Sequence, residues 1–221
     1  SAASDVYKRQ SLEEVKLRIT TKAKSLSEAK LLIQPIKEEL YETFSTYIFG
    51  EDNENLPTVL IKELIKRNES IVFAESCTGG LLSSQITSVA GSSKVFKGSV
   101  IAYSNEIKNL ILNVPKDLLN NYGAVSEEVA ESMATGVKNK FNSDWAISVS
   151  GIAGPSGASE LKPIGLVFIA ITGPNNETLK IKKQYNPLRD RNEIQRLSVN
   201  DCLNSLRSVS YTHLTLPTIN W

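Results

Sequence analysis

One segment of the chain places small polar side chains where α/β proteins bind ligands. Residues 75–80 (Glu-Ser-Cys-Thr-Gly-Gly) directly follow an apolar run at 70–74 that predicts a short buried strand, and residues 81–89 continue as a predicted helix. Such a junction gathers unpaired backbone N–H groups at the carboxyl edge of a sheet, where ligands bind. The segment fits neither a phosphate-binding loop nor a G-x-S-x-G elbow, so by itself it is equally well a capped turn.

Three further segments carry polar side chains at the predicted ends of strands or starts of helices. Residues 103–108 (Tyr-Ser-Asn-Glu-Ile-Lys) end in a lysine that, taken alone, is an exposed helix residue. Residues 151–157 (GIAGPSG) predict a loop whose amides can bind an anion or a carbonyl oxygen, or else a plain surface loop. Residues 189–191 (Arg-Asp-Arg) begin a helix and predict either a phosphate contact or a solvated cap.

The scarcity of histidine and cysteine limits the chemistry of these segments. The single histidine, His213, lies near the end of the chain, so a site in its body must work without imidazole. The two cysteines, Cys77 and Cys202, are far apart and form neither a disulfide framework nor a zinc ribbon. No cluster of His, Cys and Asp has metal-ligand spacing, so we expect no metal and no cofactor.

Composition excludes several classes of protein. With 221 residues, 41% of them hydrophobic and 22% charged, the chain has globular rather than disordered composition. A formal net charge of +1 gives no global field to attract nucleic acid or an anionic membrane. No apolar run approaches the roughly 20 residues of a membrane helix, and no signal peptide opens the chain. We therefore expect no nucleic-acid or membrane partner and a reducing cytoplasm.

The periodicity of the apolar residues predicts strands alternating with helices. Helices are expected at 56–67, 81–89, 104–112, 115–121, 126–141 and 190–206. Strands are expected at 70–74, 94–103 and 144–150, followed by a hairpin of 164–172 and 178–185. This order predicts an α/β fold with a mixed sheet and helices on both faces.

The ends of the chain differ from this pattern and suggest four parts. Residues 1–10 and 209–221 fit no neighbouring period and are interpreted as non-native flanks. A strand at 15–20 and a helix at 25–47, kinked or restarted at Pro35, cannot close a core alone. Residues 11–53 are therefore predicted to be part of a linker domain, which ends at a polar break, and residues 54–208 to be the main domain.

Four motifs of the chain together resemble the C-terminal domain of the CinA family (competence/damage-inducible protein). They are residues 75–80, 103–108, 123–127 (GAVSE) and 150–157, in this order and spacing. The resemblance covers about 54–208 and implies a three-layer α/β/α fold with a mixed, mostly parallel sheet, assembled as a homo-oligomer. Residues 11–50 are similar to the end of the linker domain in long members, whose preceding nucleotide-binding domain lies outside this chain.

Members of this family act as nicotinamide-mononucleotide amidohydrolases with a serine–lysine mechanism, so the resemblance implies a pyridine mononucleotide as substrate. It makes Ser76 the nucleophile, Lys108 the general base and Tyr103 a helper in the proton path. Lysine near its usual pKa of about 10.4 is protonated, so Lys108 needs burial or a cationic neighbour such as Arg191. Backbone amides of Cys77 to Gly79 are expected to stabilise the oxyanion.

The same segments are expected to bind the substrate. The residues are Glu75, Cys77, Thr78, Gly79, Gly80, Asn105, Gly151, Ala153, Gly154, Gly157 and Arg191. The chemistry of the loop, rather than the resemblance, suggests that amides of 151–157 or Arg191 hold the 5′-phosphate.

Two departures and two alternatives accompany this hypothesis. Where the family tends to show a second arginine one turn after Arg191, this chain has Gln195, and the 156–161 loop has fewer glycines than usual.

Cys77 is an alternative nucleophile, because a helix N-terminus stabilises a thiolate. A domain that binds the nucleotide without hydrolysing it, as a sensor or scaffold, is the non-enzyme alternative.

Overall fold

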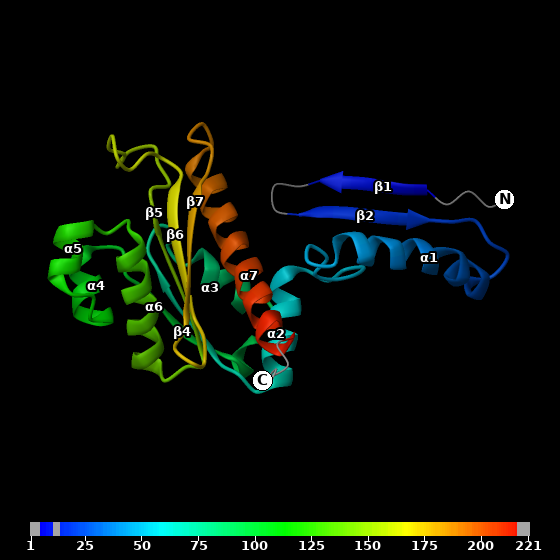
Figure 1. Cartoon of the computed structure of the whole chain (residues 1–221), viewed down its shortest axis with the longest axis horizontal. Helices are drawn as coiled ribbons and strands as arrows, with labels where there is room; N and C mark the ends of the chain where they lie inside the picture. Colours follow the sequence, from blue (N-terminus) through cyan, green and yellow to red (C-terminus); the bar gives the residue numbers. More distant parts are fainter. Residues whose placement is uncertain (1–4, 11–13, 216–221) are drawn as a thin grey trace, which may run out of the picture. The chain divides into compact units, whose positions relative to one another are not determined.

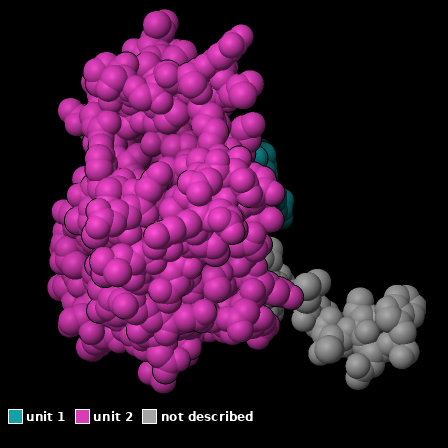
Figure 2. Space-filling model, turned by 90° about the vertical axis from the view of Figure 1, so that its left-hand side faces the viewer, with its two compact units in different colours: residues 1–53 teal, residues 54–221 magenta. Residues whose placement is uncertain are grey.

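A computed structural model describes residues 5–10 and 14–215, and it divides the chain into two compact units. The first comprises residues 1–53 and the second residues 54–221, shown in teal and magenta in Figure 2. Within the described ranges, no helix is both long and apolar enough to cross a membrane.

The first unit is a β-hairpin followed by one helix. Strand β1 (Asp5–Gln10) pairs antiparallel with β2 (Val15–Thr20), and α1 (Leu26–Phe44) begins where Ser25 Oγ accepts a hydrogen bond from the Glu28 amide. The predicted strand at 15–20 is therefore present, and β1 is an additional strand inside the stretch interpreted as a flank. The helix continues through Pro35 as a single element rather than restarting there.

A five-stranded mixed sheet forms the centre of the second unit. The strand order is β4-β3-β5-β6-β7, and the bounds are β3 (Ile71–Glu75), β4 (Phe96–Ile101), β5 (Trp145–Gly151), β6 (Leu166–Thr172) and β7 (Thr178–Gln184). Pairs β3–β4 and β3–β5 are parallel, whereas β5–β6 and β6–β7 are antiparallel. Only β6 thus runs against the other strands of this sheet, and the predicted mixed α/β fold is confirmed.

Helices cover both faces of this sheet and make three layers (Figure 1). One face carries α6 (Glu127–Phe141), with α4 (Asn105–Leu112) and α5 (Lys116–Tyr122) packed on it. The other face carries α3 (Leu81–Thr87), α7 (Arg191–Thr215) and, outside them, α2 (Leu56–Arg67). The short 3-10 helix η1 (Ser92–Lys94) leads into β4. Helix α7 extends beyond its predicted end at residue 206, into the stretch interpreted as a flank.

The central strands are buried along almost their whole length because both faces of the sheet are covered. Every residue of β3 is buried, and so are the first six of β5. The sheet register places Glu75 beside Ile101, so the carboxyl ends of β3 and β4 lie next to each other. The segments that follow these strands, which hold Ser76 and Tyr103, are therefore neighbours at one edge of the sheet.

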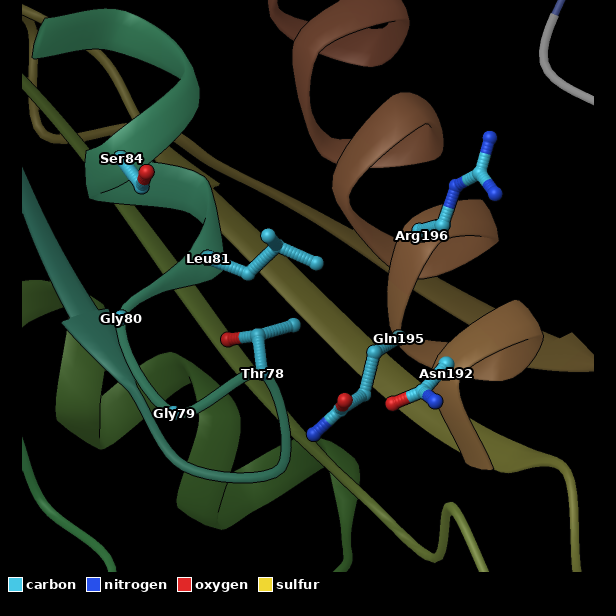
Figure 3. A pocket seen from close by; sticks show the side chains of 8 residues that line it. All are labelled: Thr78, Gly79, Gly80, Leu81, Ser84, Asn192, Gln195 and Arg196. Carbon is cyan, nitrogen blue, oxygen red and sulfur yellow. The ribbon is translucent and has the colours of Figure 1, made fainter. Parts of the chain in front are cut away.

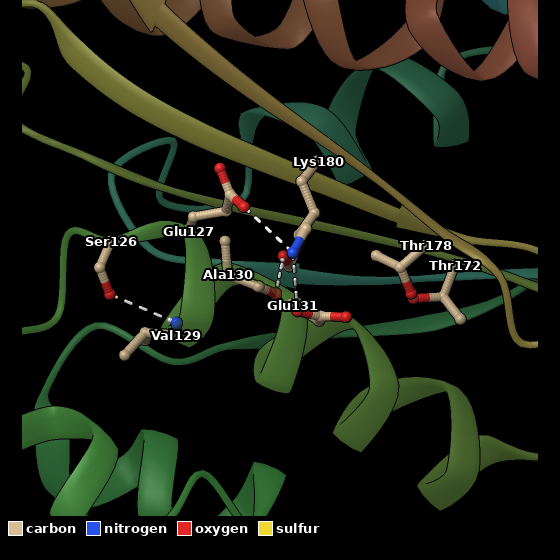
Figure 4. A network of polar contacts seen from close by, with 9 residues as sticks. Ser126, Glu127, Val129, Ala130, Glu131, Thr172, Thr178 and Lys180 are labelled. Carbon is tan, nitrogen blue, oxygen red and sulfur yellow. Dashed lines mark hydrogen bonds and ion pairs between the residues drawn. The ribbon is translucent and has the colours of Figure 1, made fainter. Parts of the chain in front are cut away.

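Polar contacts fix α6 at its start and against the last strand. Ser126 Oγ accepts a hydrogen bond from the Val129 amide at 3.3 Å, as expected of a helix cap (Figure 4). Lys180 on β7 lies 3.0 Å from Glu127 and 3.4 Å from Glu131. These exposed ion pairs contribute little individually, and the buried apolar face of α6 holds the layer together.

Gly136 marks the closest approach of α6 to α4. A Cβ atom at this position would collide with the backbone carbonyl of Leu112, the last residue of α4. Replacing a helical glycine with alanine normally stabilises a helix by up to about 1 kcal/mol. We expect Gly136→Ala to destabilise the protein instead, by about 1–3 kcal/mol, because a backbone atom cannot move aside as a side chain can.

Urea unfolding of the full chain measures this effect. Thr135→Ala, on the exposed face of the same helix, serves as the control and should leave the free energy of unfolding within about 0.5 kcal/mol. A stabilising effect of Gly136→Ala would show that the two helices are not in close contact in solution.

Candidate active site

A buried carboxylate organises the turn after β3. Glu75 is fully buried, and its two oxygens accept hydrogen bonds from five donors of the following residues. The donors are Thr78 Oγ1 (2.7 Å), the amides of Gly80 (3.0 Å), Leu82 (3.1 Å) and Ser83 (2.9 Å), and Ser83 Oγ (2.5 Å). All these donors belong to the turn or to α3, so the structure shows Glu75 holding the turn rather than facing a pocket.

Ser76 and Lys108 form the central contact of the site. Lys108 Nζ lies 3.1 Å from Ser76 Oγ, and it also donates to the carbonyl oxygens of Ala102 at 2.7 Å and Tyr103 at 3.2 Å. Lys108 is 1% exposed and Ser76 8% exposed. Taken alone, Lys108 was expected to be an exposed helix lysine; in the structure it is buried and contacts Ser76, the residue with which the family resemblance pairs it.

The chain brings these two residues together by ending two neighbouring strands in tight turns. Ser104 caps α4 by accepting a hydrogen bond from the Ile107 amide, so the helix begins almost directly after β4. Side chains on a helix point back toward its N-terminus, which aims Lys108 at the end of β4. Ser76, the first residue after β3, is held by its amide to the carbonyl of Val149 on β5.

Burial determines the protonation states of the candidate base, Lys108, and of the alternative nucleophile, Cys77. It lowers the pKa of Lys108 to about 8, because an ammonium ion loses its hydration there. About a tenth of the lysine is then a neutral amine at pH 7, able to accept the proton of the Ser76 hydroxyl. Burial also raises the pKa of the Cys77 thiol to about 12, so this cysteine is protonated and a poor nucleophile at neutral pH.

Arg191 joins three separated segments of the site. Its Nη1 donates to the carbonyl of Gly154 at 2.9 Å, and its Nη2 donates to the hydroxyl of Tyr103 at 3.1 Å. Tyr103 is 63% exposed, and its hydroxyl contacts Arg191 rather than Ser76 or Lys108 in the described part of the chain. Of the two causes that the sequence offered for a lowered pKa of Lys108, burial or a cationic neighbour such as Arg191, burial is the one that acts in the structure.

The other predicted binding residues lie at different depths around this centre. Ala153 is buried, and Gly154 has a positive φ of 77° and meets Arg191. Gly151 ends β5, where a Cβ would lie 2.8 Å from the Leu166 carbonyl, so close strand packing already requires glycine. Asn105 and Gly157 are exposed, and no hydrogen bond joins either to Ser76 or Lys108 among the described residues.

An open pocket of about 610 Å³ lies beside the turn, between α3 and the start of α7 (Figure 3). Its lining comprises Thr78, Gly79, Gly80, Leu81, Ser84, Asn192, Gln195 and Arg196, and it does not include Ser76 or Lys108. Gln195 Nε2 donates to the Cys77 carbonyl at 2.7 Å. The sequence singled out Gln195 only as a departure and missed Asn192 and Arg196, although their spacing places all three on one face of α7.

No group of three His, Cys, Asp or Glu residues able to hold a metal ion occurs within the described ranges. The described site presents a serine hydroxyl, an amine with a lowered pKa, backbone amides and an arginine.

Comparisons with a family model and with curated relatives indicate the same family. Residues 53–210 match the family model described as the CinA C-terminal domain. A protein of Prochlorococcus marinus strain MIT 9215 named CinA-like protein is 65% identical over 198 residues, covering 90% of this chain and 47% of that protein. The corresponding protein of strain NATL1A is 50% identical over 194 residues, covering 88% and 45%. The chain thus spans about half the length of the curated relatives it matches.

Solved structures agree with the fold. The competence/damage inducible protein CihA from Agrobacterium tumefaciens aligns with a TM-score of 0.69 and 35% identity, over 74% of this chain and 98% of that one. The CinA superfamily protein ECK1530/EC0983 from Escherichia coli aligns with a TM-score of 0.67 and 27% identity, over 75% and 98%.

The buried lysine generates a prediction about stability. Lys108 has a pKa of about 8 in the folded protein and near 10.4 in the unfolded chain. Between these pH values only the unfolded state binds the proton, so this lysine makes the free energy of unfolding rise with pH, by up to about 1.4 kcal/mol per pH unit. Lys108→Met keeps the side-chain length and removes the titrating amine, so we expect this contribution to vanish.

Urea unfolding from pH 7.5 to 10.5 compares the two proteins. Raised pKa values of Cys77, Cys202 and Tyr185 act in the opposite direction as pH rises, but they do so in both proteins. The difference between the two curves therefore isolates Lys108. Parallel curves would show that its pKa in the folded state is not lowered.

Proposed function

The chain belongs to the CinA family, and we propose that it hydrolyses the carboxamide of nicotinamide mononucleotide to nicotinate mononucleotide and ammonia through Ser76 and Lys108. The observation that carries this proposal is the 3.1 Å contact between Lys108 Nζ and Ser76 Oγ in a buried site. A serine next to a lysine with a lowered pKa is an activated nucleophile, and the described site offers no imidazole for that task.

The first half of the reaction forms an acyl-enzyme. Neutral Lys108 takes the proton of the Ser76 hydroxyl as Oγ bonds to the carboxamide carbon, and the carbonyl oxygen becomes an oxyanion. When the intermediate collapses, the carbon–nitrogen bond breaks and the Lys108 ammonium gives its proton to the leaving nitrogen. Ammonia departs, and the nicotinoyl group remains as an ester on Ser76, with Lys108 neutral again.

The second half repeats these steps with water. Lys108 accepts a proton from a water molecule as the water oxygen bonds to the ester carbon. Lys108 then gives that proton to Ser76 Oγ when the ester bond breaks. The product is the carboxylic acid, which ionises at neutral pH. One lysine thus acts as base and acid in both halves, which requires a pKa near the working pH.

The turn after β3 supplies the donors for the oxyanion. The sequence suggested the amides of Cys77 to Gly79, but the Gly79 amide donates to the Ser76 carbonyl at 3.2 Å. The candidates therefore narrow to the amides of Cys77 and Thr78. No described residue accepts a hydrogen bond from the Thr78 amide, so it is available to a ligand.

The remaining binding residues follow from this placement. We assign Glu75 to holding the turn, and Tyr103 and Arg191 to the mouth of the site, where the guanidinium bonds to Tyr103 and Gly154. The 5′-phosphate would meet Arg191 or amides of the 151–157 loop, because a guanidinium and backbone amides are N–H donors that bind anions. A cytoplasmic homo-oligomer and an upstream nucleotide-binding domain are part of the same proposal. Two free cysteines support the cytoplasm, relatives about twice as long support the further domain, and the homo-oligomer rests on the family alone.

Removing either member of the pair tests the proposal. We expect Ser76→Ala and Lys108→Arg each to lower ammonia release from nicotinamide mononucleotide at least about a thousandfold. The first variant lacks the nucleophile, and the guanidinium of the second stays protonated and cannot accept the proton of Ser76. Circular dichroism and thermal unfolding check that the variants fold. Wild-type turnover in either folded variant would reject the pair, and tight nucleotide binding without any hydrolysis by the full chain would favour the non-enzyme alternative.

The rate should also follow the titration of Lys108. Because the neutral amine is the active form, we expect kcat/KM to rise about tenfold per pH unit below pH 8 and to level above it. Steady-state assays from pH 6.5 to 9.5 measure the profile. A rate that falls through pH 8 as pH rises would require the ammonium form and contradict the role as base.

Replacing the neighbouring thiol separates the two possible nucleophiles. With its pKa raised to about 12, Cys77 contributes no thiolate at neutral pH, so we expect Cys77→Ser to retain at least about a third of the activity. Loss of activity in a folded Cys77→Ser protein, with Ser76→Ala still active, would move the nucleophile to the cysteine.

A further inference from the structure

Gln195 reaches across from α7 to the backbone of the nucleophile turn. Its side-chain amide donates to the carbonyl of Cys77 at 2.7 Å, although 118 residues separate the two. The side chain is partly buried and lies in the wall of the pocket between α3 and α7 (Figure 3). No other described residue donates a hydrogen bond to this carbonyl.

This hydrogen bond fixes the direction of the next amide. The peptide group between Cys77 and Thr78 is trans, so its C=O and its N–H point in opposite directions. The carbonyl faces α7, on one side of the sheet. Lys108 comes from α4, which packs with α6 on the other side (Figure 1). The Thr78 N–H is thereby directed away from α7, toward the side from which Lys108 approaches Ser76.

Four amides of the turn already donate hydrogen bonds within the protein. Ser76 donates to Val149, Gly79 to Ser76, Gly80 to Glu75, and Leu81 to Thr78, all within 3.2 Å. The amides of Cys77 and Thr78 remain, because no described residue accepts a hydrogen bond from either, and of the two only the Thr78 N–H belongs to the peptide group that Gln195 holds. A rotation of the Cys77–Thr78 peptide would turn this N–H toward α7 and place a carbonyl oxygen where the oxyanion forms.

We propose that Gln195 is a positioning residue, which holds the Cys77–Thr78 peptide so that the Thr78 N–H donates to the oxyanion formed on Ser76. The inference rests on the proposed function, since it assigns the donor that the Ser76 reaction needs. In this proposal the two ends of one peptide group have different roles. The Cys77 C=O is held by Gln195 in the wall of the pocket, and the Thr78 N–H donates to the reacting oxygen.

Gln195→Met tests this role, because methionine has similar length and no N–H donor. We expect kcat to fall about 10- to 100-fold with KM within about twofold, since one oxyanion donor is misplaced while substrate binding is kept. The pH limb near 8 should not move, because Lys108 is untouched. Gln195→Glu, which turns the donor into a charged acceptor against the carbonyl, should lose at least as much. Gln85→Met, the same change at an exposed position of α3, is the control.

A second measurement does not depend on the substrate. In the reaction of a fluorophosphonate with an activated serine, Oγ bonds to phosphorus, fluoride leaves, and the phosphoryl oxygen occupies the oxyanion position. Mass spectrometry follows the labelling of Ser76. We expect Gln195→Met to slow labelling about as much as it lowers kcat, whereas Gln85→Met labels at the wild-type rate and Ser76→Ala is not labelled.

The outcomes separate the two proposals. Equal labelling and equal kcat in wild type and Gln195→Met would overturn the positioning role, as would a rise in KM alone, which would make Gln195 a substrate-binding residue. Labelling of wild-type Ser76 without hydrolysis of nicotinamide mononucleotide would overturn the proposed substrate, while the labelling ratio still tests Gln195. An unreactive Ser76 in the wild type would overturn both.

Discussion

The structure of the site depends on placing a lysine amine where water cannot reach it. Lys108 is surrounded by a serine hydroxyl and two backbone carbonyls, and no carboxylate pairs with it among the described residues. An isolated buried ammonium is costly, so the environment favours the neutral amine. The tight exits of β3 and β4, the early start of α4 and the close contact of α4 with α6 all serve to keep the amine in this position.

The turn that carries Ser76 is held from three directions. The Glu75 carboxylate accepts hydrogen bonds from amides and hydroxyls of the turn and of α3. The Val149 carbonyl on the neighbouring strand accepts from the Ser76 amide, and Gln195 on α7 donates to the Cys77 carbonyl. Arg191, one helical turn before Gln195, joins the loop after β5 to Tyr103. The first turns of α7 thus contact the turn after β3, the loop after β5 and Tyr103, which follows β4.

Local patterns predicted the sheet strands and most of the helices, because buried parallel strands and capped helices leave clear signals in sequence. The motifs also assigned Ser76, Tyr103 and Lys108 to one predicted site, and chemical reasoning placed Arg191 beside them. Sequence could not supply the hydrogen bond of Gln195 or the burial of Lys108, since both depend on contacts between segments far apart in the chain. Sequence analysis also missed β1, which pairs with β2 but whose own residues show no strong apolar alternation. It also underestimated the length of α7.

The burial of Lys108 has a consequence for the lifetime of the site in a cell. An amine with a pKa near 8 is more nucleophilic at neutral pH than an ordinary lysine, and so more easily carbamylated or acylated by reactive metabolites. At 1% exposure, the Lys108 amine is screened from such electrophiles by the same packing that lowers its pKa and leaves part of it neutral at neutral pH. The chemical activation of this lysine and its protection from damage therefore have a single physical origin.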